Sequence, residues 1–521
     1  MKNTSLFILF CLILLNLSAQ NIPHVEKDKI IHNGAEFDII SITISSKEKD
    51  NLKEEDFIRI KSWKTNTVRL LFDASILESI EPPHSIQESG FKWFDKYIEL
   101  AKDNQLKVIL AMNTPPGGLR PSDDRAYMWT NRGFRGRYKN IWLAISKKYS
   151  SNESVIAYEL LSEPLPSYRS QWKELANVVT SQIRSNDKKH MIIFNRIDGA
   201  KTKYGNDKNL NFVKLNDTNV IYGFQFYNPT TFTTQHAPGG MKEAGKYPDN
   251  KKTEYPEDLT TVFSFTPQKK IINGTRETYA YVTETFQYLD TNTICAKPVI
   301  VCNKIGNVGH VAFSNIFIRE FKPSGDFSEE VLTVNPMEYE YSWKFNSTDG
   351  QGRIELDPNY GVEGTSAIKV MYVEANSKTH NNLIRFKPKY GYSYNIESFV
   401  RPQKIKSESD CYIGLDFEKS SSNDTPHGRN NEYVVKTFEQ LTQFGKDNKV
   451  PLMVTQFGTT VETLRKNKGG GLWITDVVNL CKQNEVHYSY YKYTGKYYSL
   501  YPKAKNTIKQ EPFQGVSSVI K

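Results

Sequence analysis

The sequence has few cysteines, few histidines and no long apolar stretch after its first residues. Its 521 residues include 5 cysteines and 9 histidines, and these do not group with the paired spacing of a zinc site. We therefore predict neither a metal nor a cofactor. The mixture of 38% hydrophobic and 24% charged residues excludes collagen, a coiled coil, wholesale disorder and a polytopic membrane protein. A globular chain of this length exceeds a single core, so we expect two domains.

Residues 1–20 have the pattern of a secretory signal peptide. Lys2 supplies a positive charge, residues 6–15 form an unbroken apolar run, and small residues precede a cleavage point near Ala19-Gln20. A membrane anchor needs about 20 apolar residues, which is roughly twice the length of this run. We expect a secreted or periplasmic protein with no transmembrane segment after signal removal.

Charge and cysteine usage leave several interpretations open. Without residues 1–20 the chain carries 67 basic against 58 acidic side chains, a formal charge of +9. This excess fits either an anionic polymer as partner or a generally basic soluble protein, and we expect no nucleic-acid partner. Cys295 and Cys302 are candidates for a disulfide in an oxidising compartment, but their spacing does not fix the pairing. Cys481 follows Trp473 and Val477 at helical spacing, which predicts a core position.

Short apolar strands alternate with amphipathic helices between residues 66 and 229. The predicted strands are 67–72, 106–111, 155–161, 191–195 and 220–226, and the predicted helices are 91–104, 138–148 and 172–184. Strands separated by helices indicate βαβ units and a parallel sheet. Five or more such strands favour a barrel or a large doubly wound sheet.

The pattern changes at about residue 254, where helical periodicity becomes scarce and short alternating stretches take over. We predict an all-β, jelly-roll-like sandwich over residues 254–428. Helices from 434 and over 473–482, with strands at 450–455 and 486–491, then restore the earlier rhythm. Residues 21–253 and 429–521 therefore form one (β/α)8 TIM barrel, with the sandwich inserted between its sixth and seventh strands.

Polar side chains follow several predicted barrel strands, at the face where TIM barrels carry their chemistry. Residues 158–164 (YELLSEP) resemble the YELLNEP signature of glycoside hydrolase family 5, the cellulase-like barrels. Further segments are similar to that family's N-x-V-R-L strand, H-x-x-P-G-G loop, H-x-Y-x-P stretch and G-E-F-G strand end: 66–70 (NTVRL), 113–118 (NTPPGG), 225–229 (QFYNP) and 454–458 (VTQFG). The resemblance implies that Glu163 is the catalytic acid/base and that Arg69 and Tyr227 contact substrate.

The departures from the family pattern concern the same site. Gln456 stands where the resemblance places the nucleophile, and Ser162 replaces the Asn that binds the sugar 2-hydroxyl. Asn113 and Gln225 replace two histidines, and Tyr490 is our substitute for a missing Trp near the last strand. Retaining hydrolysis needs two carboxyl groups about 5–5.5 Å apart, whereas a glutamine amide is isosteric but uncharged.

Other carboxylates have alternative roles. Glu163 could be a structural ion-pair partner of Arg69, and Glu159, four positions earlier, is expected to be a buried structural partner. Asp73 and Asp198 near strand ends are either solvated loop residues or replacement carboxylates. An inverting mechanism requires such a base about 6.5–9.5 Å from the acid.

The insert resembles bacterial carbohydrate-binding β-sandwiches. Residues 312–320 (AFSNIFIRE) are similar to their F-D-D-I-x-I-x-E strand, and 364–370 (GTSAIKV) to G-x-x-A-L-x-V. Ser314 and Asn315 replace the acidic pair, which argues against a calcium site of that type. A purely architectural domain that braces the barrel is the competing interpretation.

Three functional hypotheses follow for an exported carbohydrate-active protein. One is a polysaccharide-binding pseudoenzyme, because Gln456 replaces the nucleophile. Another is a divergent O-glycosyl hydrolase that uses Glu163 as acid. The third assigns the positive charge to sulfated or uronic polysaccharides as partners.

Overall fold

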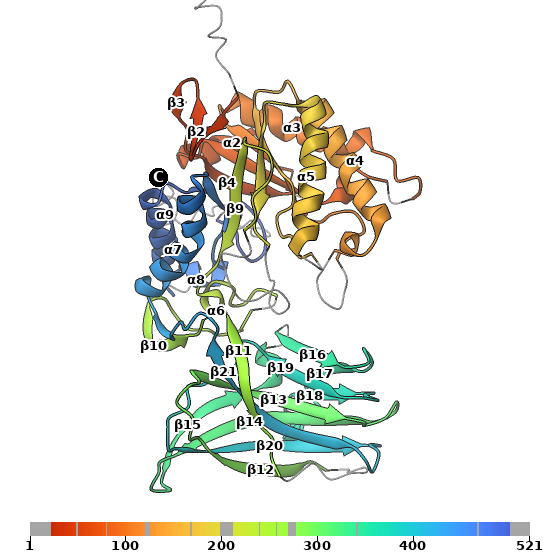
Figure 1. Ribbon diagram of the computed structural model, residues 1–521, viewed down its shortest axis with the longest axis vertical. Coiled ribbons are helices and arrows are strands. Elements are labelled where there is room, and N and C mark those ends of the chain that lie inside the picture. The colour runs from red at the N-terminus through yellow and green to blue at the C-terminus, as the bar shows by residue number, and fades with distance from the viewer. Residues whose placement is uncertain are drawn as a thin grey trace, which may run out of the picture. The chain divides into compact units, whose positions relative to one another are not determined.

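The computed structural model describes residues 22–47, 51–79, 81–119, 126–166, 169–197, 212–238, 240–256, 258–268, 278–339, 342–465 and 468–500. The chain divides into two compact units (Figure 1): unit 1, Met1–Tyr227 with Val434–Lys521, and unit 2, Asn228–Tyr433. The predicted signal peptide, residues 1–20, lies outside the described residues. Within the described ranges, no helix combines the length and apolarity that a bilayer span requires.

Unit 1 is a closed barrel of eight parallel strands, which confirms the predicted TIM barrel. In chain order the strands are β4 (Ile40–Ser45), β5 (Thr67–Phe72), β6 (Lys107–Met112), β7 (Val155–Glu159), β8 (Met191–Asn195), β9 (Val220–Phe226), β23 (Leu452–Phe457) and β24 (His487–Tyr490). The barrel closes where β24 pairs with β4, and β23 pairs with β9. The sequence prediction omitted β4, because its Ser and Thr residues alternate with Ile although all but Ile40 are buried.

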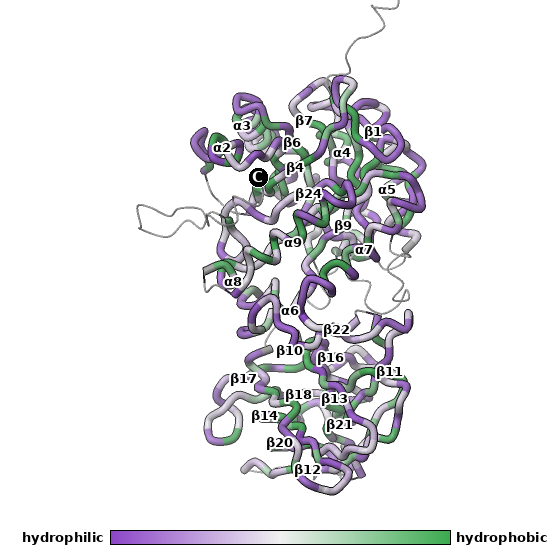
Figure 2. Tube along the Cα trace, turned by 90° about the vertical axis from the view of Figure 1, so that its left-hand side faces the viewer, coloured by the Kyte–Doolittle hydropathy of each residue, from purple (hydrophilic) through white to green (hydrophobic). Residues whose placement is uncertain are grey.

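Amphipathic helices surround the barrel. They are α2 (Glu54–Ser62), α3 (Glu88–Asp103), α4 (Arg132–Tyr149), α5 (Arg169–Asn186), α7 (Asn431–Asn448), α8 (Val461–Arg465) and α9 (Gly470–Gln483). Helix α3 buries Phe91, Phe94 and Ile98, which lie on one face at helical spacing. Helix α9 buries Cys481 as predicted. Figure 2 shows hydrophobic residues along β4 and β6, and hydrophilic residues on the turns of α2.

A small antiparallel sheet precedes the barrel and packs against its core. It consists of β1 (His24–Glu26), β2 (Lys29–His32) and β3 (Ala35–Glu36). Ile30 of β2 belongs to one apolar cluster with the barrel residues Ile109, Ile156 and Ile193. The start of the described chain thus contributes directly to the barrel core.

Unit 2 is inserted between β9 and β23, the sixth and seventh barrel strands, as predicted. One antiparallel sheet has the order β11-β21-β13-β19-β16 and the other β12-β20-β14-β18-β17, with β15 on β14. The strands are β11 (Leu259–Phe265), β12 (Ala280–Gln287), β13 (Cys295–Asn303), β14 (His310–Phe321), β15 (Phe327–Val334), β16 (Trp343–Ser347), β17 (Arg353–Asp357), β18 (Ala367–Met371), β19 (Ser377–Asn381), β20 (Ser393–Gln403) and β21 (Asp410–Ser420). Phe313 and Ile318 of one sheet share a core with Ile300 and Leu415 of the other, which makes a sandwich.

Unit 2 also contains elements outside this sandwich. The strands β10 (Asp249–Glu254) and β22 (His427–Arg429) form a separate antiparallel pair, and α6 (Thr230–Thr233) is a single helical turn. Arg429 Nε donates to Glu254 Oε1 over 2.6 Å, and both side chains are buried. Burial dominates at Glu254 and raises the pKa of its carboxyl despite this partner.

The cysteine pairing considered from the sequence does not form. Cys295 and Cys302 lie seven residues apart on β13, which corresponds to roughly 23 Å of extended strand and is far beyond disulfide reach. Cys302 instead faces Cys411 of β21 across the sheet. These three cysteines and Cys481 are buried free thiols.

Candidate active site

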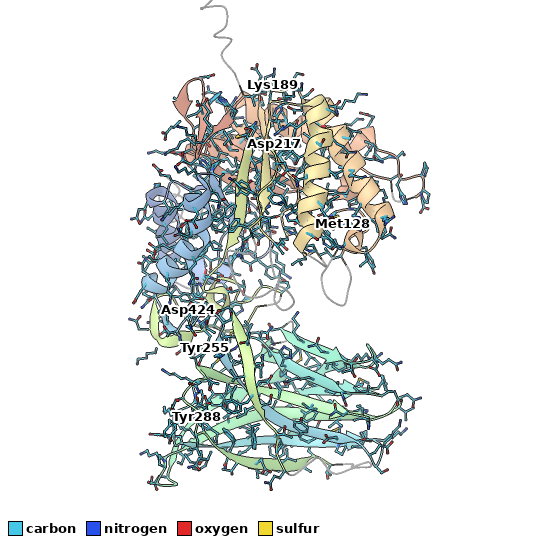
Figure 3. The ribbon with its side chains drawn as sticks, viewed as in Figure 1. Met128, Lys189, Asp217, Tyr255, Tyr288 and Asp424 are labelled. Atoms are coloured by element: carbon cyan, nitrogen blue, oxygen red, sulfur yellow. The ribbon has the colours of Figure 1, made fainter. Side chains whose placement is uncertain are left out.

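The predicted site residues lie toward the ends at which the barrel strands finish. Figure 3 shows Lys189, which precedes β8, at the top of unit 1, and Met128, on the connection after β6, lower in the same unit. Glu163 follows β7 and Gln456 lies near the end of β23. The carboxyl ends of parallel barrel strands meet at one face, so these residues come from distant parts of the chain to one place.

A buried ion pair forms the floor of the site. Arg69 Nε donates to Glu159 Oε2 over 2.6 Å and Arg69 Nη2 donates to Glu159 Oε1 over 2.7 Å. Both side chains are fully buried. Arg69 Nη1 also donates to Thr43 Oγ1 over 3.3 Å, and Asn195 Nδ2 donates to Glu159 Oε1 over 2.7 Å. Arg69 is therefore the ion-pair partner of Glu159, which the sequence analysis expects to be a buried structural residue.

Asn195 links this floor to neighbouring strands. Its side chain also donates to Leu161 O over 2.8 Å and accepts from Thr455 Oγ1 over 3.0 Å. Gly223 on β9 leaves the room that Asn195 occupies. A Cβ at Gly223 would lie 2.0 Å from Asn195 Oδ1 and 2.8 Å from Thr455 Cγ2. Glycine is thus required at this point by a close side-chain approach.

Above the ion pair, three polar side chains form a hydrogen-bonded series. Arg69 Nη2 donates to Ser162 Oγ over 2.9 Å, and Gln456 Nε2 donates to the same oxygen over 2.6 Å. Tyr227 Oη donates to Gln456 Oε1 over 3.3 Å. Ser162 and Gln456 are only 1% and 3% exposed. The Gln456 amide is thereby held by partners on both its nitrogen and its oxygen.

Glu163 is the exposed carboxylate beside this series. Gln225 Nε2 donates to Glu163 Oε1 over 3.0 Å. The backbone before Glu163 is fixed, because Leu160 O accepts from Tyr138 Oη over 2.8 Å and Ser162 N donates to Met112 O over 2.8 Å. Glu163 therefore combines access to solvent with a rigid support.

Asn113 is hydrogen-bonded to the carboxylate of Asp73, which is not part of this series. Asn113 Nδ2 donates to Asp73 Oδ1 over 2.9 Å, and the same oxygen accepts from Thr114 N over 3.1 Å. Lys47 Nζ lies 3.7 Å from Asp73 Oδ2. Asp73 is accordingly bound to the loop that follows β6. Asp198, the other replacement carboxylate considered, lies outside the described residues.

The aromatic residues of the site differ from the sequence selection. Tyr490 is fully buried, with its ring 5.4 Å from that of Phe457. Tyr498 instead approaches Tyr227, at 6.0 Å between ring centroids, and Tyr491, at 5.8 Å. The many tyrosines after β24 indicated that aromatic rings lie near this strand end. The position of each tyrosine along the chain did not indicate which ring faces the site.

The phenols of this cluster resist ionisation. Burial raises the pKa of Tyr227 well above its usual range, and Tyr498, Tyr491 and Glu163 add electrostatic repulsion of a phenolate. Burial likewise raises the pKa of Tyr498. The tyrosines therefore act as neutral hydrogen-bond donors and apolar surfaces. In the described part of the chain no group of three or more His, Cys, Asp and Glu residues could hold a metal ion.

The closed eight-stranded parallel barrel, with polar side chains at the strand ends, defines the class of TIM-barrel proteins. The structure of the endoglucanase Cel5A from Thermotoga maritima with cellobiose aligns with a TM-score of 0.48 and 14% identity, covering 92% of this chain and 96% of that one. Residues 31–277 match the family described as cellulase, glycosyl hydrolase family 5. Over these residues the chain is similar to the cellulase-like TIM barrels of glycoside hydrolase family 5.

Two curated relatives agree with this family. Endoglucanase C of Acetivibrio thermocellus is 27% identical over 214 residues, which are 41% of this chain. Cellodextrinase A of Ruminococcus flavefaciens is 26% identical over 239 residues, 43% of this chain and 68% of that protein. The chain spans 60% of the length of the endoglucanase.

Proposed function

We propose that this protein is an exported glycoside hydrolase that acts on a polysaccharide, with Glu163 as general acid and without a protein carboxylate as nucleophile. The family match and the activities for which the two similar proteins are named support the reaction class. One observation carries the departure in mechanism: Gln456, at the end of β23, is held by Ser162 and Tyr227 beside Glu163. The position at which the family resemblance expects a nucleophile therefore carries an uncharged amide.

Glu163 has the features that a general acid requires. It is exposed, its backbone is fixed, and Gln225 binds one of its carboxyl oxygens. Protonation of the leaving oxygen by a positioned acid typically contributes about 10²–10⁴-fold in rate. Gln456 cannot replace a carboxylate in double displacement, because it carries no charge and an amide attacks C1 poorly.

The buried floor explains how a neutral residue at position 456 is tolerated. Arg69 is neutralised by Glu159 with two short hydrogen bonds. A buried guanidinium without a partner is strongly destabilising. Because Glu159 supplies that partner, the site needs no carboxylate at Gln456 to balance the charge.

A polysaccharide-binding pseudoenzyme is the second candidate. It is favoured by the amide and tyrosine lining, in which Gln456, Tyr227 and Tyr498 offer hydrogen bonds and ring surfaces without acid–base chemistry. Binding of this type needs no second catalytic group. Because the chain carries a net positive charge, anionic polymers are tested as partners together with neutral ones.

The test records reducing-end release and polymer depletion together, for the full chain and for Glu163→Gln, against neutral and anionic polysaccharides. Glu99→Gln, on the exposed face of α3, is the matched control that removes a carboxylate far from the site. Release that falls about 10²–10⁴-fold in Glu163→Gln and persists in the control supports the hydrolase. Depletion without release in any form supports the pseudoenzyme, and loss of depletion with rising salt identifies an anionic partner.

A further inference from the structure

The site holds a general acid but presents an amide where a retaining hydrolase has its nucleophile. Gln456 Nε2 is 2.6 Å from Ser162 Oγ, and Gln456 Oε1 accepts from Tyr227. Glu159 is not a substitute, because both its oxygens are occupied by Arg69 and it is fully buried. The group that attacks C1 must then come from outside this set of side chains.

Ser162 indicates which part of the sugar lies beside the amide. It directly precedes Glu163 in the sequence and contacts Gln456 in the structure. Its Oγ accepts hydrogen bonds from both Arg69 and Gln456. C1 of a bound sugar must lie between the acid and Gln456, so the substituent on C2 is its neighbour on this side. Serine is shorter than the asparagine that the family resemblance expects at this position.

We propose that the substrate carries a 2-acetamido group and that this group is the nucleophile. The proposal rests on the proposed function, since it takes Glu163 as the acid of a hydrolase. Substrate-assisted glycosidases are an established exception to the two-carboxylate scheme, and they dispense with the protein nucleophile. An uncharged Gln456 and a short Ser162 then have one common explanation.

The reaction has two steps. The acetamido carbonyl oxygen forms a bond to C1 while the glycosidic C1–O bond breaks, and the leaving oxygen takes the proton of Glu163. The products are the leaving sugar, a cationic five-membered oxazolinium ring and the Glu163 carboxylate. Water then adds to C1, the C1–O bond of the ring breaks to restore the acetamido group, and Glu163 takes a proton from that water.

Gln456 is a positioning residue in this scheme. Its carbonyl oxygen has two lone pairs, of which Tyr227 uses one. The other accepts the N–H of the acetamido group and aims the acetamido oxygen at C1. Ser162 holds the far end of the same amide, so its orientation is fixed before substrate arrives.

The test uses the full chain and hexasaccharides of one linkage that differ only at C2: N-acetylchitohexaose, its deacetylated form and cellohexaose, with hyaluronan as an anionic acetamido polymer. Aryl N-acetylglucosaminide oligomers with one, two or three fluorines on the acetyl group extend the series. Fluorine withdraws electrons from the attacking oxygen, so the rate is expected to fall with each fluorine. Gln456→Ala is expected to lower kcat on acetamido substrates more than it raises KM.

The outcomes separate the two proposals. Cleavage confined to acetamido substrates, with the falling fluorine series, supports the inference. Cleavage of cellohexaose at a similar rate, or a flat fluorine series, overturns it and leaves the hydrolase proposal standing. Absence of cleavage throughout the panel and throughout the polysaccharides of the first test overturns both.

A second observation concerns unit 2 and is independent of the barrel. Cys302 of β13 lies directly opposite Cys411 of β21 in an antiparallel pair. Directly opposed residues have Cα atoms about 4.5–5.5 Å apart, within the range of about 4.4–6.8 Å for disulfides. Both side chains are fully buried in the sandwich core.

We infer that Cys302 and Cys411 form a disulfide when the chain folds in the presence of an organic disulfide as oxidant. Thiol–disulfide exchange joins the two sulfur atoms, releases two protons and transfers two electrons, which reduce the oxidant to two thiols. Burial raises the pKa of the Cys302 thiol, so the exchange precedes closure of the core. The bond would join β13 and β21 across a long loop of intervening sequence.

Refolding in mixtures of reduced and oxidised glutathione, followed by alkylation in denaturant and peptide mass mapping, tests this inference. The expected result is one Cys302–Cys411 cross-link, with Cys295 and Cys481 alkylated, and a higher melting temperature of unit 2. Cys481→Ser should leave the cross-link unchanged, and Cys411→Ser should abolish it without new pairing. Alkylation of both Cys302 and Cys411, or a link between other cysteines, refutes the disulfide.

Discussion

The ion pair beneath the site provides the most direct test of how the barrel is stabilised. Arg69 and Glu159 are joined by hydrogen bonds of 2.6 and 2.7 Å, and neither side chain is exposed. Glu159→Gln keeps the volume of the side chain and removes its charge. The substitution leaves the Arg69 guanidinium buried without a counter-ion.

The expected loss is about 3–5 kcal/mol of unfolding free energy, the range for removal of one partner from a buried pair. For a domain of this size it corresponds to a drop in melting temperature of roughly 6–20 °C. Arg69→Met/Glu159→Leu removes both charges, and it is expected to be less destabilised than Glu159→Gln because no charge is left unpaired.

Urea denaturation followed by tryptophan fluorescence is the appropriate assay. Six of the seven tryptophans belong to unit 1, so the signal reports mainly on the barrel: Trp63, Trp93, Trp129, Trp142, Trp172 and Trp473. Glu99→Gln breaks an exposed pair with Lys102 and should change stability by less than about 1 kcal/mol. A loss below 1 kcal/mol in Glu159→Gln would refute the argument that Glu159 balances Arg69.

Three further predictions follow. Gln456→Glu introduces the missing carboxylate and is expected to raise reducing-end release from a neutral glucan above that of the parent; an unchanged rate would mean that position 456 is not the limiting departure. Burial lowers the pKa of His487 to about 4, so the unfolded chain binds the proton first as pH falls. Barrel stability should be complete above about pH 6.5 and decline by about 3 kcal/mol toward pH 4. In His487→Gln, urea midpoints across this range should lose most of that slope. Gly223→Ala drives a methyl group into Asn195 and should cost about 1–3 kcal/mol in the same assay; a neutral result would show that Asn195 moves freely.

Periodicity predicted most of the barrel. The strands β5, β8 and β9 begin and end at the predicted residues, because apolar runs between amphipathic helices give a strong local signal. The strand β4 escaped, since Ser41 and Thr43 look like solvent-facing residues although both are fully buried. When polar residues line the barrel interior, buried and exposed positions no longer differ in polarity, and the strand cannot be recognised from its sequence pattern.

The structure brings several of the predicted site residues together. Strand-end position selected Glu163, Gln456, Ser162, Gln225 and Tyr227, and hydrogen bonds join Glu163 to Gln225 and the other three in one series. Ring direction could not be predicted in the same way. Successive side chains of a strand point to opposite faces, so a shift of one residue separates the buried Tyr490 from Tyr491, which contacts Tyr498.

By itself the sequence determined the alternation of strands and helices, the inserted β unit and the residue types near the strand ends, because these depend on local periodicity and composition. Tertiary structure alone decided the partners. It assigned Arg69 to Glu159, Asn113 to Asp73 and Cys302 to Cys411, pairs that are separated by 90, 40 and 109 residues. Such pairings depend on barrel closure and sheet register, which bring distant strands together and leave no mark in the spacing along the chain.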